Sequence, residues 1–210
     1  MNKFRLLNSL ILATVFTCLL FSNFSHAQTA EQYNNWGLAK GTKGDWKGAI
    51  QDYTKAIELS PDFIKAYGNR AYARNILEDY KGVVADYNKI IELDPNMYSA
   101  YYGKALAEGK RGNYKEQIQD LNIYIEHNPK SFFAYLERGD AKMRIGDYKG
   151  AVQDYSKNIE LDSISALGYK NRALAEFNLN QIDTGCKDMI KAGELGFVLA
   201  DDYLKKYCNK

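Results

Sequence analysis

The sequence predicts an all-α fold, a solenoid of about five helix-turn-helix repeats followed by a C-terminal capping helix. The stretch from Gly44 to Phe63, GDWKGAIQDYTKAIELSPDF, returns four times, and each copy begins 34 residues after the last. The three prolines obey the same spacing, and so do five tyrosines. These are Pro61, Pro95, Pro129, Tyr33, Tyr67, Tyr101, Tyr135 and Tyr169. A fixed period of this size is typical of stacked helical pairs.

The first 27 residues have the pattern of a secretory signal peptide. Lys3 and Arg5 precede an apolar run over 10–21, and small residues end at Ala27, where we expect cleavage. The alternative is a retained membrane anchor. Even counted from 6 to 21 the run has 16 residues, whereas a membrane-spanning helix needs about 20. We therefore predict an exported protein, periplasmic or secreted, with membrane contact only if the segment stays uncleaved.

The charge of the remaining chain argues against nucleic acid as a partner. The full sequence has 28 basic and 26 acidic residues. Cleavage after Ala27 removes two basic residues and no acidic one, so the two numbers become equal. A protein that follows a phosphate backbone needs a basic stripe, and the sequence offers none.

Each repeat is expected to hold two helices. In the first, helix A carries Tyr33 and Gly37, a Gly-Asp turn follows, and helix B presents Ala49 and Tyr53 on one face. Pro61 then ends the pair. We expect the array to span 28–196, with repeats at 30–63, 64–97, 98–131, 132–165 and a degenerate fifth at 166–199.

These residues resemble the tetratricopeptide repeat family. Its pattern of aromatic, small residue, Ala-x-x-x-aromatic and proline is met by Tyr33, Gly37, Ala49, Tyr53 and Pro61, and again in later repeats. The resemblance implies a right-handed superhelical solenoid. The chain departs from the pattern in its last three repeats, at Gln117, Ser163, Gly185 and Phe197.

Charged residues recur across the helix pairs at a spacing of 16 residues. The pairs are Arg70 with Asp86, Arg138 with Asp154 and Arg172 with Asp188. We expect ion pairs that fix the register of helix A on helix B. The alternative is an ordinary solvated surface, where such pairs contribute about 0–1 kcal/mol.

The sequence offers little catalytic chemistry. After cleavage one histidine remains, His127, without the partners that a nucleophile or a zinc site requires. No phosphate-binding glycine loop or nucleophile elbow occurs. We predict a non-enzymatic protein with no cofactor and no metal.

The resemblance implies that function lies in a groove lined by the A helices, which holds a protein or peptide partner. The expected groove residues are Asn34, Leu38, Tyr72, Asn75, Tyr102, Leu106, Lys110, Leu136, Asp140, Met143, Lys170, Leu174 and Phe177. Scattered surface exposure is the alternative. The carboxylate clamp of co-chaperone members is not expected, because its positions hold Asn34, Leu38, Asn69, Ser99 and Gly103, of which only Asn69 fits.

The favoured interpretation is an exported scaffold similar to the small exported tetratricopeptide proteins of Gram-negative bacteria. A glycan- or cell-wall-associated accessory protein and a self-associating structural protein are the alternatives. Tyr72 and Tyr102 would serve a glycan as well as a peptide.

The end of the chain is expected to form a capping helix over 197–210. Phe197, Ala200, Tyr203, Leu204 and Tyr207 share one helical face, which would cover the last repeat. Cys186 and Cys208 are the two cysteines left after cleavage, and an even pair in an exported chain favours a disulfide. The turn at Gly196 lies between them and would bring both to nearly the same height. Two free thiols are the alternative.

Overall fold

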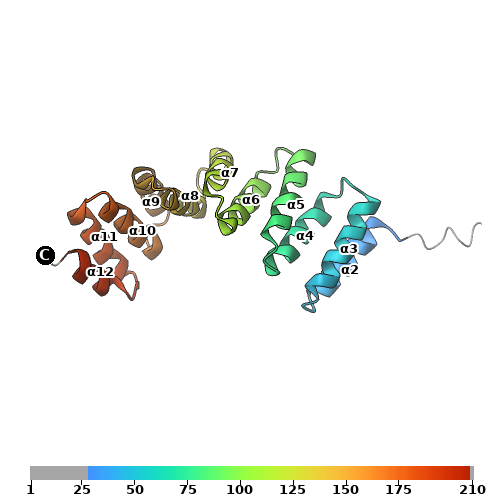
Figure 1. Cartoon of the computed structure of the whole chain (residues 1–210), viewed down its shortest axis with the longest axis horizontal. Coiled ribbons are helices and arrows are strands. Elements are labelled where there is room, and N and C mark those ends of the chain that lie inside the picture. The colour runs from blue at the N-terminus through green and yellow to red at the C-terminus, as the bar shows by residue number, and fades with distance from the viewer. Residues whose placement is uncertain (1–27, 209–210) are drawn as a thin grey trace, which may run out of the picture. The chain divides into compact units, whose positions relative to one another are not determined.

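The computed structural model describes residues 28–208, so the predicted signal peptide lies outside the described residues. Within this range the chain forms eleven helices and no strand, which confirms the all-α prediction (Figure 1). The described part divides into two compact units, at 28–66 and 67–208, each of which is considered by itself. None of its helices is long and apolar enough to span a membrane.

The helices alternate as the repeat pattern predicts. The first unit contains α2 (Ala30–Gly41) and α3 (Trp46–Leu59), and the division falls within α4 (Ile64–Ile76). The second unit continues with α5 (Tyr80–Leu93), α6 (Tyr98–Arg111), α7 (Tyr114–His127), α8 (Phe132–Arg144), α9 (Tyr148–Leu161), α10 (Ala166–Asn178), α11 (Ile182–Glu194) and α12 (Ala200–Tyr207). From α5 to α12 each helix packs against the next.

The turns between the paired helices have one shared geometry. The residue two positions before helix B has a positive φ in every repeat, at Gly44, Gly112 and Gly146, and also at Glu78 and Asn180, whose φ angles are 59° and 60°. Glycine adopts this left-handed region without steric cost, whereas glutamate does not. The repeat geometry therefore overrides local preference at Glu78.

Small residues on helix A let the aromatic ring of helix B approach closely, as the sequence predicts. A Cβ atom on Gly37 would lie 2.5 Å from Cε1 of Tyr53, and one on Gly139 would lie 2.6 Å from Cε1 of Tyr155. No L side chain fits in that space without moving the ring. These glycines are therefore required by packing.

The predicted ion pairs are confirmed. Guanidinium–carboxylate distances are 2.6 Å for Arg70–Asp86 and 2.5 Å for both Arg138–Asp154 and Arg172–Asp188. Asp86 and Asp154 are only 1% and 3% exposed, so the alternative of a solvated surface is wrong for these two pairs. A second cation reaches each of these carboxylates, from Arg74 at 2.7 Å and from Lys142 at 2.8 Å. Such buried pairs specify register more than they add stability.

The capping helix α12 begins at Ala200, three residues later than predicted, and covers the end of the second unit. Its apolar face packs on a cluster built from Ala173, Phe177 and Met189. The ring of Tyr207 stacks on Phe177 with 4.4 Å between centroids. The structure joins Cys186 of α11 to Cys208 as a disulfide, with Cα atoms 6.0 Å apart. The predicted pairing is therefore compatible with the fold.

Candidate functional site

Two adjoining pockets open along the A helices of the second unit. The α8–α10 pocket has a volume of about 420 Å³ and is lined by Asp140, Met143, Arg144, Tyr148, Tyr155, Lys170, Asn171, Leu174 and Asn178. The α6–α8 pocket has a volume of about 520 Å³ and is lined by Asn75, Leu106, Gly109, Lys110, Tyr114, Gln117, Glu137, Asp140, Ala141 and Arg144. Because both contain Asp140 and Arg144, the two pockets adjoin, and together they are called the groove.

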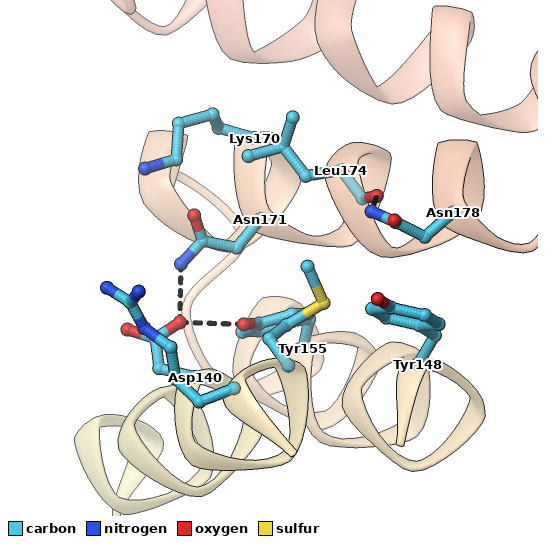
Figure 2. A pocket seen from close by; sticks show the side chains of 9 residues that line it. Asp140, Tyr148, Tyr155, Lys170, Asn171, Leu174 and Asn178 are labelled. Carbon is cyan, nitrogen blue, oxygen red and sulfur yellow. Dashed lines mark hydrogen bonds between the residues drawn. The ribbon is translucent and has the colours of Figure 1, made fainter. Parts of the chain in front are cut away.

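The floor of the α8–α10 pocket is a hydrogen-bonded link between three helices. Oδ1 of Asp140 on α8 accepts a hydrogen bond of 2.6 Å from the hydroxyl of Tyr155 on α9 and one of 2.8 Å from Nδ2 of Asn171 on α10 (Figure 2). A polar contact shared by three consecutive helices fixes their relative rotation. The pocket floor is thus preformed.

Burial shifts the pKa values of the titratable groups in the two pockets. Burial raises the pKa of the Asp140 carboxyl, and the hydrogen bond from Tyr155 and the charge of Lys170 act in the opposite direction. Burial, with the adjacent Asp140 carboxylate, also raises the pKa of the Tyr155 hydroxyl, so this group remains a donor. The pKa of Glu137 in the neighbouring pocket is raised by burial and then by Asp140, and Lys110 lowers it.

The two ends of the α8–α10 pocket differ in character. Figure 2 shows Lys170 and Asp140 at one end and Tyr148 with Asn178 at the other. Leu174 lies on α10 between them. Leu174 and Met143, the two apolar non-aromatic side chains that line the pocket, are together called its apolar wall. The site can therefore hold a charged group and an apolar group side by side. Its residues are suited to binding, and no arrangement of nucleophile and base occurs among them.

Most of the groove residues predicted from the second unit's sequence come together. Asn75, Leu106 and Lys110 line the α6–α8 pocket; Met143, Lys170 and Leu174 line the α8–α10 pocket; Asp140 belongs to both. Leu136 packs beside this site against the cluster of Ala151 and Tyr155. The ring of Tyr102 packs on Tyr124, with 4.8 Å between centroids. Leu38 and Tyr72 are exposed, at 44% and 59%, and line neither pocket.

Two predicted groove residues are buried instead. Phe177 is 9% exposed and lies under the capping helix, against Tyr207 and over Gly185. The prediction that its ring faces a ligand is wrong, because Gly185 leaves room for the ring within the helix pair. Asn34 in the first unit is 5% exposed, so its side chain has no open surface to offer a partner.

Sequence reasoning missed four residues that line the α8–α10 pocket besides Tyr155: Arg144, Tyr148, Asn171 and Asn178. The repeat pattern of the sequence could have identified two of these four residues. Arg144 and Asn178 lie 34 and 68 residues after Lys110, at the same position of the repeat. Tyr148 comes from helix B, which the prediction did not consider.

The described residues offer neither a metal-binding cluster nor more than one histidine. Over residues 28–208, no group of three or more His, Cys, Asp or Glu side chains is placed to hold a metal ion. The ring of His127 stacks on Tyr98 with 3.6 Å between centroids. The expected absence of catalysis stays a prediction.

Comparison with known proteins supports the repeat assignment. Residues 37–75 match the family model described as TPR repeat, and residues 64–97 match the one described as tetratricopeptide repeat. No curated protein sequence matches the chain significantly.

Several solved structures share the fold. A crystal structure of MamA is 23% identical, covers 87% of this chain and 97% of its own, and has a TM-score of 0.77. MamA from Desulfovibrio magneticus RS-1 is 20% identical over 79% of this chain and 94% of its own, with a TM-score of 0.75. YrrB, described as a TPR protein with an unusual peptide-binding site, is 19% identical over 91% of this chain and 97% of its own, with a TM-score of 0.76. Residues 37–97 thus match tetratricopeptide repeat models, and most of the chain shares the fold of MamA and of YrrB.

Proposed function

We propose that the chain is an exported scaffold that binds an extended segment of a protein partner in the groove of the second unit. The observation that carries the proposal is the pair of adjoining pockets, which open on four A helices and share Asp140 and Arg144. Seven of the residues predicted from the family resemblance line these pockets. The peptide-binding site named for YrrB, a protein of the same fold, is in agreement.

The size and spacing of the pockets favour a peptide. Each pocket holds several hundred cubic ångströms, comparable to the lower end of ligand sites in general. Two such adjoining pockets suit two side chains of one extended segment. A glycan would need an open aromatic ring in the groove. The Tyr102 ring packs on Tyr124, and the exposed Tyr72 lines neither pocket, so the peptide is favoured.

Two features support export. The first 27 residues have a basic start, a short apolar run and small residues at the end. The Cys186–Cys208 disulfide of the fold is of the kind that persists in oxidising compartments. Protein recovered from its own host should begin at Gln28, and an N-terminus that retains residues 1–27 would count against cleavage.

The groove is tested by a crosslinking pull-down from the cell envelope. Met143→Glu and Leu174→Glu each place a charge in the apolar wall of the α8–α10 pocket. Both should lose the partner that the wild type retains. Lys149→Glu is the matched control, because Lys149 is exposed on α9 and lines neither pocket.

Circular dichroism should show equal helicity in all three variants. If the two pocket variants retain the partner as well as the control does, the groove is not the binding site.

A further inference from the structure

Arg144 differs from every other arginine that the structure describes. Between residues 28 and 208 there are six arginines, and five of them form ion pairs with Asp or Glu. Arg144 alone has no carboxylate within ion-pair distance, although it is close enough to Asp140 to lower the pKa of that carboxyl. It lies at the junction of the two pockets, where a ligand would pass.

The fold itself does not require a cation at this place. The positions equivalent to Arg144 in the other repeats hold Thr42, Ile76, Lys110 and Asn178. Those equivalent to Lys170, the second cation of the α8–α10 pocket, hold Asn34, Gly68, Tyr102 and Leu136. Arg144 and Lys170 belong to neighbouring repeats, and the three other junctions between repeats form without a matching pair of cations. Packing therefore does not account for Arg144 and Lys170 together.

The charges facing the α8–α10 pocket do not cancel. Asp140 is the one carboxylate among its lining residues, and Arg144 and Lys170 are the cations. Oδ1 of Asp140 already accepts hydrogen bonds from Tyr155 and Asn171. The Nζ atom of Lys170 lies 5.7 Å from the centre of the Phe197 ring, a contact that leaves its charge uncompensated. The pocket therefore has an excess of one positive charge and suits an anionic group.

The neighbouring pocket does not change this balance. It adds Lys110 and Glu137, and Lys110 is close enough to lower the pKa of the Glu137 carboxyl. These two opposite charges offset each other. The excess of positive charge thus remains at Arg144 and Lys170.

An apolar subsite adjoins the two cations. Met143 and Leu174 form its wall, and Tyr148 lies at the far end of the pocket (Figure 2). Resting on the proposed function, we infer that the groove selects a peptide in which an acidic residue adjoins a bulky apolar residue. The carboxylate lies between Arg144 and Lys170, and the apolar side chain packs on Met143 and Leu174.

The test is a selection with a displayed library of random peptides of about 12 residues, which extend to roughly 40 Å at ~3.3 Å per residue. The purified protein, its Arg144→Glu variant and the Lys149→Glu control are used in parallel. The wild type and the control should enrich Asp or Glu next to Leu, Ile, Met or Phe. The Arg144→Glu variant should lose the acidic preference and keep the apolar one.

The peptide most enriched on the wild type then serves as the probe for affinity. Arg144→Glu and Lys170→Glu should each raise the Kd for this peptide by about tenfold or more. The reason is that a charge pair in a partly desolvated site contributes more to affinity than one on the surface. Added salt should weaken binding to the wild type and have less effect on the variants.

The outcomes separate the two proposals. Enriched peptides without acidic residues, or the same acidic preference in Arg144→Glu, would overturn the inference and leave peptide binding intact. If no peptide is enriched on the wild type, both the inference and the proposed function fail. If the cations merely neutralise Asp140, the variants should lose thermal stability with no change in peptide preference, and this result also overturns the inference.

Discussion

The sharpest structural prediction concerns Gly185, which occupies a position where two other repeats have alanine. Substitution of Gly185 by Ala would therefore restore the more common residue. It should nevertheless destabilise the protein, because a Cβ atom there would lie 2.5 Å from Cε1 of Phe177 and 3.2 Å from the carbonyl oxygen of Ala173. Phe177 cannot move away freely, since its other face stacks on Tyr207.

Two opposing effects determine the magnitude. Overpacking of a core costs about 1–3 kcal/mol, and Ala in place of Gly inside a helix contributes about 1 kcal/mol of stability. The net loss for Gly185→Ala is then about 1 kcal/mol, or a Tm lower by about 2–4 °C for a chain of this size. Gly68→Ala is the matched control, because a Cβ atom on this helical glycine meets nothing within 4 Å and the substitution should stabilise.

A double-mutant cycle tests the reasoning. The fourth repeat combines Met143 with Ala151 at the two positions that hold Phe177 and Gly185 in the fifth. In a Phe177→Met background, Gly185→Ala should therefore change sign and stabilise by about 1 kcal/mol, a coupling of about 2 kcal/mol between contacting residues. Thermal and urea unfolding, monitored by circular dichroism, give the stability change caused by Gly185→Ala in each of the two backgrounds. The same destabilisation in both backgrounds would refute the assigned contact between Phe177 and Gly185.

Three further predictions follow from the described contacts. Cys208→Ser should lower the free energy of unfolding by about 3 kcal/mol for a separation of 22 residues; an unchanged Tm, or two free thiols in protein purified without reductant, would contradict it. Burial and then Asp188 raise the pKa of Glu176 above its ordinary value near 4.5, so the stability contributed by this group falls as the pH rises from there through its folded-state pKa. Glu176→Gln should therefore stabilise the protein more at about pH 7 than at about pH 4, in Tm measurements. Tyr135→Ala should cost about 3–5 kcal/mol because Tyr135 is 9% exposed, and Tyr101→Ala should cost less because Tyr101 is only partly buried; equal losses in urea unfolding would argue against this ranking.

The fold was predictable because its determinants are local and repeated. Prolines, glycines and tyrosines at a constant spacing mark the same turn and the same packing contact in successive repeats. The ion pairs at a spacing of 16 residues were equally accessible, since one helical pair brings the two ends together. Glu78 shows the limit of such local reasoning, because its left-handed backbone follows from the repeat and not from its own preference.

The site was predictable only in part. Whether a side chain on helix A is exposed in the groove depends on the residue opposite it on helix B. Phe177 occupies a position at which the repeat pattern predicts a groove residue, but Gly185 on the partner helix accepts its ring. The third repeat has the opposite arrangement, with the glycine on helix A and the larger residue on helix B. There Gly109 makes room for Gln117. A position-by-position mapping of the groove does not detect such exchanges. The same mapping passed over Arg144, whose lack of an ion pair is visible only once its neighbours are placed.

The repeats themselves provide a way to separate packing from binding. At Gln117 and at Phe177, a departure from the repeat pattern is matched by a compensating glycine on the partner helix, so the fold explains it. Asp140 also departs, since its equivalents are Leu38, Tyr72, Leu106 and Leu174, and the hydrogen bonds from Tyr155 and Asn171 compensate for it. Arg144 has no ion pair or hydrogen bond among the described residues that would account for it in this way. Substitutions at compensated positions should therefore lower stability, whereas substitution of Arg144 should change what the groove binds.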